Sequence, residues 1–333
     1  MSIDFTILGA GVAGLTTAQE LTTRGARVQI IDPHGAPGPH GCSWWAGGML
    51  APHCESEISD EIVVRHGLRA ADWWAKAGVP VTHRGTLVVT LARDRRELDR
   101  FARRTDGHCW LDAAGIAALE PDLADRHERG LFFGTEAHIE PRVALAVLRE
   151  GLADKGVEIM PDAPHQGRLV DCRGLEARDH LPALRGVRGE MVVLRCPQIG
   201  LSRPVRLLHP RYPLYIVPRG NGIFMLGASQ LEGDSRGPST LRSTVELLNA
   251  AFALHPAFAE AEVLELGANA RPGFADNIPR VVVGADRVFV NGLFRHGYLM
   301  SPALAMTAAD YLLDGQNSEL LLSEPLLQEA PCA

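Results

Sequence analysis

The fold of this chain is decided by residues 4–32, DFTILGAGVAGLTTAQELTTRGARVQIID. The apolar run Phe5–Leu8 is typical of a buried parallel strand, and a helical pattern follows it directly and ends at Gly25. Between them lies the glycine turn GAGVAG, residues 9–14. A second apolar strand then ends at Asp32, whose carboxylate can accept hydrogen bonds from a ribose. Strand, glycine turn, helix, strand and acid together form the dinucleotide-binding fingerprint in its full setting.

Each residue type in the turn has a physical task. Gly9 permits the tight turn, Gly11 has no Cβ to keep a pyrophosphate away, and Gly14 lets helix and strand pack closely. Free N–H groups at the helix start, around Val12 and Ala13, then face the diphosphate. The alternative is an ordinary tight turn, but the full context favours a bound adenine dinucleotide. The fingerprint alone does not separate FAD from NAD.

Composition sets the class of protein. With 333 residues, 46% hydrophobic residues, 22% charged residues and 34 glycines, we expect a soluble α/β protein of two domains, or one domain with an insertion. A formal charge of −7 shows no basic excess, which argues against nucleic acid or an anionic membrane as partner. No apolar run approaches the length of a membrane span, and the first strand starts too early for a leader. We therefore expect a cytoplasmic protein.

The cysteines and histidines show no metal-binding pattern. The six cysteines are scattered without a CxxC pair, and the 13 histidines are dispersed without HxH or HExxH spacing. In a cytoplasmic chain this favours free thiols over disulfides, and we expect no metal site.

A second informative stretch is CSWWAGGMLAP, residues 42–52. The adjacent tryptophans are also compatible with a simple core position. Gly47 and Gly48, however, let the backbone approach a flat ligand closely, and Met49 offers a soft apolar contact.

The remaining pattern contrasts with the opening unit. Strands are predicted over 186–194, 212–219 and 223–228, and the hairpin signal RGNG at 219–222 joins the last two. This implies an antiparallel sheet in a second domain. Helices are predicted over 60–77, 93–103, 112–119, 141–152, 243–258 and 302–313.

Three local features concern the ends of helices and strands. The last helix is predicted to have Ser301 as N-cap and Pro302 as its first residue, which would make its start an anion site. His138 and Glu140 resemble an acid–base pair, but a loop feeding the helix from Pro141 is favoured. The run from Leu169 is predicted to form a strand that leads into a glycine turn.

The segment from Ser43 to Leu50 resembles the one that passes along the flavin in the D-amino acid oxidase superfamily, particularly the glycine oxidases of thiamine thiazole synthesis. The resemblance covers nearly the whole chain, with four separated motifs in the right order. It implies FAD, held non-covalently because no cysteine lies between Cys196 and Cys332. The implied fold is α/β, with a Rossmann-like FAD-binding domain on a parallel sheet and an interleaved antiparallel-sheet substrate domain. The implied bounds of the FAD-binding domain are 1–82, 135–185 and 266–325. Those of the substrate domain are 83–134 and 186–265, and a tail follows at 326–333.

The resemblance also implies the site residues. Arg271, in Arg-Pro-Gly, resembles the family's carboxylate-binding arginine, and a guanidinium suits both carboxylate oxygens; an ion-pair role is the alternative. Tyr215 matches a tyrosine that holds the same carboxylate, although a strand tyrosine is usually core. Arg295 matches an arginine near substrate and flavin. The expected FAD contacts are Gly9, Gly11, Val12, Ala13, Gly14, Asp32, Ser43, Ala46, Gly47, Gly48, Met49, Cys172, Gly174, His296, Gly297, Tyr298 and Leu299.

The chain also departs from the family pattern. The ribose acid is Asp32 where relatives usually have Glu, and His296 follows Arg295 where glycine oxidases usually have Asn. Pro213 stands where some relatives carry His, and the loop 229–232 lacks a methionine that can line the substrate pocket. These departures leave the choice of substrate open.

The predicted activity is oxidation of a small amino acid, glycine to iminoacetate, with O₂ as acceptor, supplying dehydroglycine for the thiazole of thiamine. Alternatives are a D-amino acid or sarcosine-type dehydrogenase that passes electrons to a carrier, and a flavoprotein that modifies a peptide or serves as a scaffold. An NAD-dependent dehydrogenase is disfavoured by the Ser43–Met49 segment. We expect a homo-oligomer.

Overall fold

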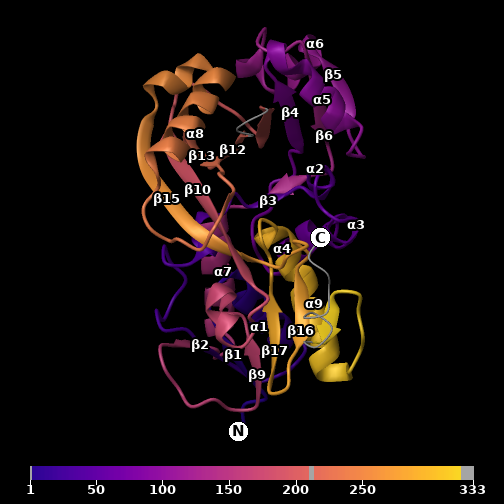
Figure 1. Cartoon of the computed structure of the whole chain (residues 1–333), viewed down its shortest axis with the longest axis vertical. Helices are drawn as coiled ribbons and strands as arrows, with labels where there is room; N and C mark the ends of the chain where they lie inside the picture. Colours follow the sequence, from indigo (N-terminus) through magenta and orange to yellow (C-terminus); the bar gives the residue numbers. More distant parts are fainter. Residues whose placement is uncertain (1, 210–213, 324–333) are drawn as a thin grey trace.

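The computed structural model describes residues 2–209 and 214–323, in which two large sheets divide the molecule (Figure 1). The predicted tail at 326–333, Tyr212, Pro213 and Cys332 lie outside the described residues. The lower sheet in Figure 1 has the order β18-β16-β17-β9-β1-β2-β8. Its strands are β1 (Phe5–Leu8), β2 (Val28–Ile31), β8 (Ile159–Met160), β9 (Arg168–Asp171), β16 (Arg280–Val283), β17 (Arg287–Asn291) and β18 (Leu321–Ser323).

The strand pairs of this sheet are parallel apart from β16 with β17. Strand β1 lies between β2 and β9, so the carboxyl ends of three strands from distant parts of the chain meet beside the glycine turn. The predicted α/β class with a parallel sheet is confirmed.

The upper sheet has nine strands in the order β14-β10-β13-β12-β11-β4-β6-β5, with β15 paired to β10. They are β4 (Thr86–Thr90), β5 (Cys109–Asp112), β6 (Arg129–Phe133), β10 (Arg185–Arg195), β11 (Val205–Leu208), β12 (Leu214–Pro218), β13 (Ile223–Gly227), β14 (Leu231–Glu232) and β15 (Glu262–Gly273). The predicted hairpin is present, with positive φ at Gly220, Asn221 and Gly222. The pairs are antiparallel except β4 with β11.

One long strand pair connects the two parts of the molecule. Strands β10 and β15 pair along their full lengths, from Arg185–Gly273 to Arg195–Glu262. Strand β15 therefore runs unbroken across the boundary predicted between residues 265 and 266. The short strands β3 (Met49–Leu50) and β7 (Ala137–His138) form a third, two-stranded sheet.

The described helices are α1 (Val12–Thr23), α2 (Pro52–Glu55), α3 (Glu61–Gly67), α4 (Ala70–Lys76), α5 (Arg95–Ala102), α6 (Ala113–Leu119), α7 (Pro141–Ala153), α8 (Leu241–Leu254) and α9 (Gly297–Asp314). The predicted helix 60–77 is therefore two helices, broken after Gly67, which packs against Leu299 of α9. The predicted helix 243–258 ends at Leu254, and Pro256 begins a separate 3₁₀ turn. Among these helices, none is both long enough and apolar enough to span a membrane.

The predicted start of the last helix is wrong. Helix α9 begins at Gly297, five residues before Pro302, which lies inside it. Proline has no N–H for the Tyr298 carbonyl one turn earlier, but the indole Nε1 of Trp74 donates to that oxygen at 2.8 Å. A side chain from α4 thus replaces the missing helical bond, and Ser301 is buried within the helix instead of capping it.

Acidic side chains cap the starts of α6 and α7. Asp112 accepts from the Gly115 N–H at 2.8 Å at the start of α6. Glu140 accepts from the Val143 N–H at 2.6 Å, with Pro141 as the first residue of α7. Glu140 therefore caps a helix, as the favoured interpretation of the His138–Glu140 stretch required.

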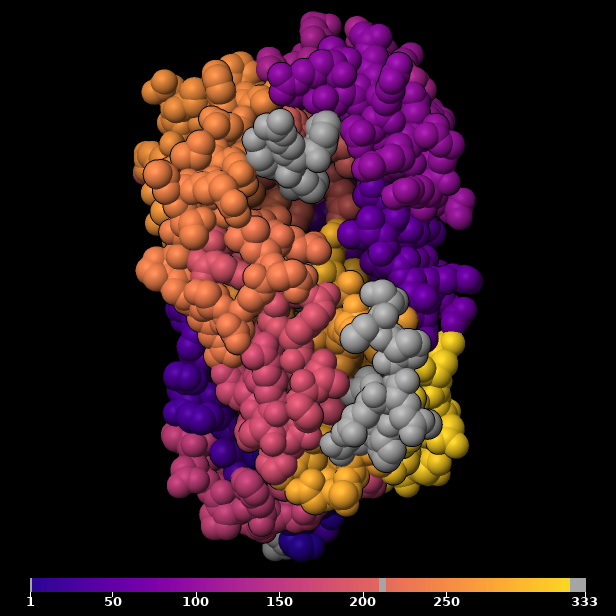
Figure 2. All heavy atoms as spheres, in the orientation of Figure 1, coloured from indigo at the N-terminus to yellow at the C-terminus, as the bar shows by residue number. Residues whose placement is uncertain are grey.

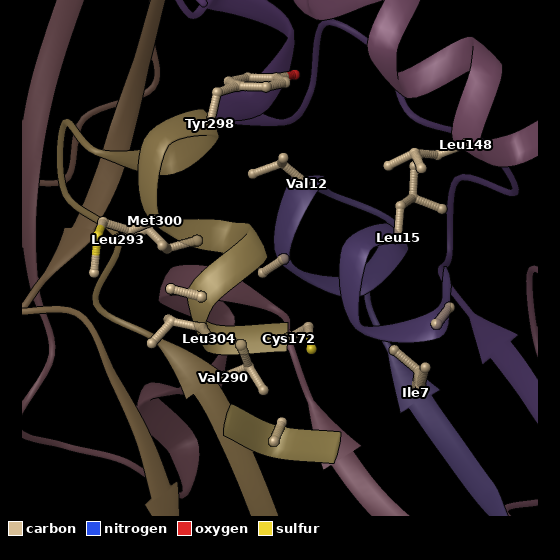
Figure 3. Packing of buried hydrophobic residues seen from close by; sticks show 14 of the residues in the cluster. Ile7, Val12, Leu15, Leu148, Cys172, Val290, Leu293, Tyr298, Met300 and Leu304 are labelled. Carbon is tan, nitrogen blue, oxygen red and sulfur yellow. The ribbon is translucent and has the colours of Figure 1, made fainter. Parts of the chain in front are cut away.

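The core of the lower part is built by α1 and α9 packing side by side over the parallel sheet (Figure 3). Leu15 of α1 and Met300 and Leu304 of α9 are fully buried, with Ile7 of β1 and Val290 of β17 beneath them. This packing brings the N-termini of both helices to the same edge of the sheet, facing the upper part of the molecule.

Candidate active site

A cavity of about 1080 Å³ lies between the two large sheets. Figure 2 shows the molecule hollowed between the orange segment around α8 and the purple segment around α5, and residues of both line the cavity. The volume is at the upper end of that for small-molecule sites, as a dinucleotide together with a small substrate requires. Every predicted site residue lines it except Gly14.

The glycine turn is shaped by backbone contacts that leave no room for side chains. Gly9 has φ +97°, and a Cβ there would lie 2.8 Å from the carbonyl oxygen of Cys172. A Cβ on Gly14 would lie 1.9 Å from the carbonyl oxygen of Gly9. Gly14 thus acts through packing of α1 on the turn, and the turn is held against the end of β9.

The first turn of α1 lines the cavity, and its N-cap residue is a glycine, which has no side chain to cap the helix. Its N-cap is Gly11, and Ser43, from the 3₁₀ turn η1 (Cys42–Trp45), accepts from the Val12 N–H at 3.0 Å through Oγ. Asp32 braces the turn, with Oδ2 accepting from the Ala10 N–H at 2.8 Å. Exposed helix N–H groups beside side-chain-free backbone fit the diphosphate of an adenine dinucleotide.

Asp32 has a second backbone partner, the His34 N–H, which donates to Oδ1 at 2.9 Å. Each carboxylate oxygen has two lone pairs, so Asp32 keeps acceptor capacity for a ribose. The shorter acid thus supports the glycine turn, and its role as a ribose acceptor stays a prediction.

Gly47 and Gly48 leave space for the Tyr215 ring and for the Ile139 carbonyl oxygen, respectively. A Cβ on Gly47 would lie 2.8 Å from the ring of Tyr215, and a Cβ on Gly227 would lie 2.6 Å from the same ring. Gly48 has φ +73°, and a Cβ there would lie 2.2 Å from the Ile139 carbonyl oxygen. The two glycines at 47 and 227 therefore hold the phenol of Tyr215 in a narrow slot at the cavity.

The N-terminus of α9 also faces the cavity. His296 is its N-cap residue, and Gly297, Tyr298 and Leu299 form the first turn, whose N–H groups have no intrahelical acceptor. This is the anion-binding helix start that the sequence analysis placed at Ser301. The Tyr298 hydroxyl donates to the Ser43 carbonyl oxygen at 3.0 Å and ties the two halves of the site together.

Arg271 presents a guanidinium that lacks a carboxylate partner among the described residues. It packs flat over Gly189, where a Cβ would lie 2.0 Å from Nη2. Its nearest acceptor is the Ser229 carbonyl oxygen, 3.4 Å from Nη1. Burial lowers the pKa of Arg271 from its usual range. A cation in such a position fits an anionic ligand.

Arg295 is placed differently, because it is paired with an acid, Glu55, that no sequence motif indicates. Its Nε lies 2.9 Å from Oε2 of Glu55, and Nη2 lies 3.0 Å from Oε1. Arg206 of β11 contacts the same carboxylate at 2.5 Å. Glu55 and Arg206 come from elements without a local motif, so only their meeting at the cavity identifies them.

The charges of this cluster fix its protonation states. Burial alone would raise the pKa of Glu55, but the charges of Arg295 and Arg206 outweigh it and lower the pKa to about 2. Burial lowers the pKa of His296 to about 4, despite the nearby Glu55 carboxylate. At neutral pH the cluster therefore contains two guanidinium ions, one carboxylate and a neutral imidazole.

The cysteines and the possible metal ligands show no arrangement for chemistry among the described residues. Cys172 is buried against the glycine turn, and the five cysteines in the described ranges are unpaired. Within the same ranges, no group of three or more histidine, cysteine or acidic side chains is arranged to hold a metal ion.

Comparisons with known proteins agree with this geometry. A family described as FAD dependent oxidoreductase matches residues 4–311. A Rhizobium etli protein, assigned by name as the thiamine biosynthesis oxidoreductase ThiO, is 54% identical over 316 residues, covering 92% of this chain and 96% of the relative. A glycine oxidase of Pseudomonas aeruginosa is 28% identical over 382 residues, covering 100% and 99%. The crystal structure of glycine oxidase from Geobacillus kaustophilus has a TM-score of 0.78 at 19% identity, covering 95% and 96%.

Proposed function

Because this chain belongs to the family of FAD dependent oxidoreductases, we propose that it oxidises glycine to iminoacetate with O₂ as acceptor and supplies dehydroglycine for thiamine thiazole synthesis. The observation that carries the proposal is the partly buried guanidinium of Arg271, which has no carboxylate partner among the described residues and lines, with Tyr215, the cavity at the glycine turn. Relatives named as a thiamine biosynthesis oxidoreductase and as glycine oxidases support it.

Bound FAD supplies a two-electron acceptor for the Cα–H bond of the amine. The chain's own residues hold the substrate. Arg271 offers two parallel N–H donors to the substrate carboxylate, and Tyr215, fixed between its two glycines, offers a hydroxyl to the same group. Neutral His296 adds no positive charge that would repel a protonated substrate amine on its way in. We propose that FAD is bound non-covalently, because the sequence around Arg271 has no cysteine to which it could be attached.

The test is the visible spectrum of the purified protein, mixed with glycine without oxygen. We expect flavin absorbance that glycine bleaches, and peroxide once air is admitted. Bleaching by D-alanine or sarcosine but not by glycine would replace the substrate. A reduced enzyme that air does not reoxidise would replace O₂ by a carrier, and flavin that no amino acid reduces would overturn the proposal.

A further inference from the structure

The cavity contains more positive charge than a single carboxylate substrate needs. Arg206 and Arg295 share the one carboxylate of Glu55, which leaves this cluster with a net charge of +1. Arg271 adds a second unneutralised charge nearby, close enough for the charge of Arg295 to lower the Arg271 pKa. A buried charge without a counter-ion is unfavourable by several kcal/mol, as an order of magnitude, so a surplus of this kind indicates an anionic ligand.

Of the three arginines, Arg206 is the most buried one that contributes to this excess positive charge. It lines the cavity while only 8% exposed, and one of its donors, Nε, has no hydrogen-bond partner among the described residues. Its other groups are used, with Nη2 on Glu55 and Nη1 donating to the Cys54 carbonyl oxygen at 3.4 Å. Nothing in the proposed binding of glycine requires this arginine.

Two titratable groups packed against the cluster offset its charge only in part at pH 6.5. His296 adds no charge at pH 6.5, because burial lowers its pKa to about 4. Besides Glu55, the acid that acts on Arg206 is Glu136, whose Oε1 accepts from the Cys54 N–H at 2.8 Å. Burial raises the pKa of Glu136 to about 7, so below pH 7 it mostly keeps its proton. The start of α9, which contributes partial positive charge, faces the region predicted for the flavin and is assigned to the cofactor.

We infer that Arg206, Glu55 and Arg295 form a second anion subsite, so that the enzyme also oxidises amines that carry a second carboxylate. This inference rests on the proposed function, in which Arg271 holds the first carboxylate. Two placements of the second group have the required chemistry: on the nitrogen, as in iminodiacetate, or on the side chain, as in D-aspartate. In either, the Cα–H and N–H bonds would break and a C=N bond would form, with bound FAD supplying the two-electron acceptor and O₂ becoming peroxide, after which water would hydrolyse the imine.

The unaltered holoenzyme tests the inference with matched substrates at pH 6.5. Iminodiacetate is compared with sarcosine, and D-aspartate with D-alanine, since each pair differs by the second carboxylate. We expect kcat/KM to favour one dicarboxylate over its partner by about 10-fold or more, chiefly through KM, as a charge-assisted hydrogen bond provides. The pair that shows the preference identifies the placement. No preference in either pair overturns the inference.

Variants of Arg206 test whether this residue causes the preference for dicarboxylates. Arg206→Gln is expected to reduce the dicarboxylate-to-monocarboxylate ratio about 10- to 100-fold, and Arg206→Lys to retain part of it. The matched control is Arg203→Gln, another buried arginine, paired with Glu120 away from the cavity lining, which should keep the ratio. A ratio unaffected by both Arg206 variants would overturn the assignment.

A binding measurement separates this inference from the proposed function. Malonate and acetate are titrated into the holoenzyme while the flavin spectrum is followed, which requires no turnover. Tighter binding of malonate that is lost in Arg206→Gln supports the subsite, even if no amino acid reduces the enzyme and the proposed function fails. Equal binding of the two acids, with glycine oxidised normally, would overturn the subsite and leave the proposed function intact.

Discussion

The two ends of the cavity are built to bind anions by different means. At the α1 end the donors are backbone N–H groups beside Gly11, in one contiguous turn that Gly14 keeps packed against Gly9. At the upper-sheet end the donors are guanidinium groups, such as those of Arg206 and Arg271, brought from separate strands. The first kind of site depends on the absence of side chains, and the second on side chains with few partners.

This difference has consequences for stability. The backbone site costs little in the free protein, because N–H groups at a helix start can be solvated. The arginine site stores buried positive charge that its own acids neutralise only in part. We therefore expect the two ends to respond oppositely to mutation: loss of a glycine damages the fold, whereas loss of an unpaired arginine damages function and spares the fold.

The largest effect is expected for Gly14→Ala. The new Cβ would meet the Gly9 carbonyl oxygen at 1.9 Å, and backbone cannot yield without moving α1 away from β1. We expect a loss of about 3 kcal/mol or more in the free energy of unfolding, together with loss of bound flavin. Thermal unfolding and the flavin absorbance of the purified protein measure both.

The control for that variant is Gly151→Ala, in the interior of α7, where a Cβ meets no atom within 4 Å. It should raise stability by about 0.5–1 kcal/mol, since alanine favours the helix. Equal behaviour of the two variants would contradict the role given to the tight glycine turn.

Arg271→Leu is the next in size. We expect kcat/KM for glycine to fall about 100- to 1,000-fold, because both carboxylate donors are lost. The melting temperature should stay the same or rise, since a partly buried cation without an ion-pair partner among the described residues is removed. Steady-state kinetics and calorimetry test the two halves separately.

Arg142→Leu serves as the comparison, because Arg142 pairs with Glu265 outside the cavity lining. Its activity should stay near that of the unaltered enzyme. A large fall in stability for Arg271→Leu would show that the guanidinium supports the fold and is not reserved for the substrate.

Glu136 should make the arginine end sensitive to pH. Burial raises its pKa from 4.5 to about 7, so the folded protein holds the proton more tightly than the unfolded chain. The folded state therefore loses about 3 kcal/mol relative to the unfolded chain as pH rises from 4.5 to 7. Denaturant unfolding at pH 5 and pH 8 should show a smaller change in Glu136→Gln than in the unaltered protein; identical pH dependence would refute the assignment.

The smallest effect concerns the helix start at the backbone end. Ser43→Ala removes the hydroxyl that accepts from the Val12 N–H and should cost about 1 kcal/mol of stability, as loss of an N-cap does. Ser301→Ala is its control, since the buried Ser301 hydroxyl has no partner among the described residues and its removal should be neutral or stabilising. Chemical denaturation of the two variants side by side distinguishes the roles.

The contrast also explains which parts of the site were predictable. The turn from Gly9 to Gly14 is local, so its spacing in the sequence already implies its geometry. Tyr215 and Arg271 were found through the resemblance, not through their spacing. Glu55 and Arg206 escaped notice, because an acid in a short helix and an arginine in a strand carry no pattern until they meet.

The start of α9 shows why a local rule fails. Ser301 followed by Pro302 has the residues of a helix start, and by local preference alone the prediction was sound. The indole of Trp74 satisfies the Tyr298 carbonyl that proline leaves free, so the helix begins at Gly297. A tertiary contact overrides the local signal.

The sequence by itself determined the parallel-sheet unit, the glycine turn and the β12–β13 hairpin, because each depends on interactions between residues close in the chain. Only the tertiary structure decided where α9 begins, which glycines make the slot for Tyr215, and how the arginines share one carboxylate. Those features depend on groups far apart in sequence, whose charges and volumes act on each other only once the two sheets enclose the cavity.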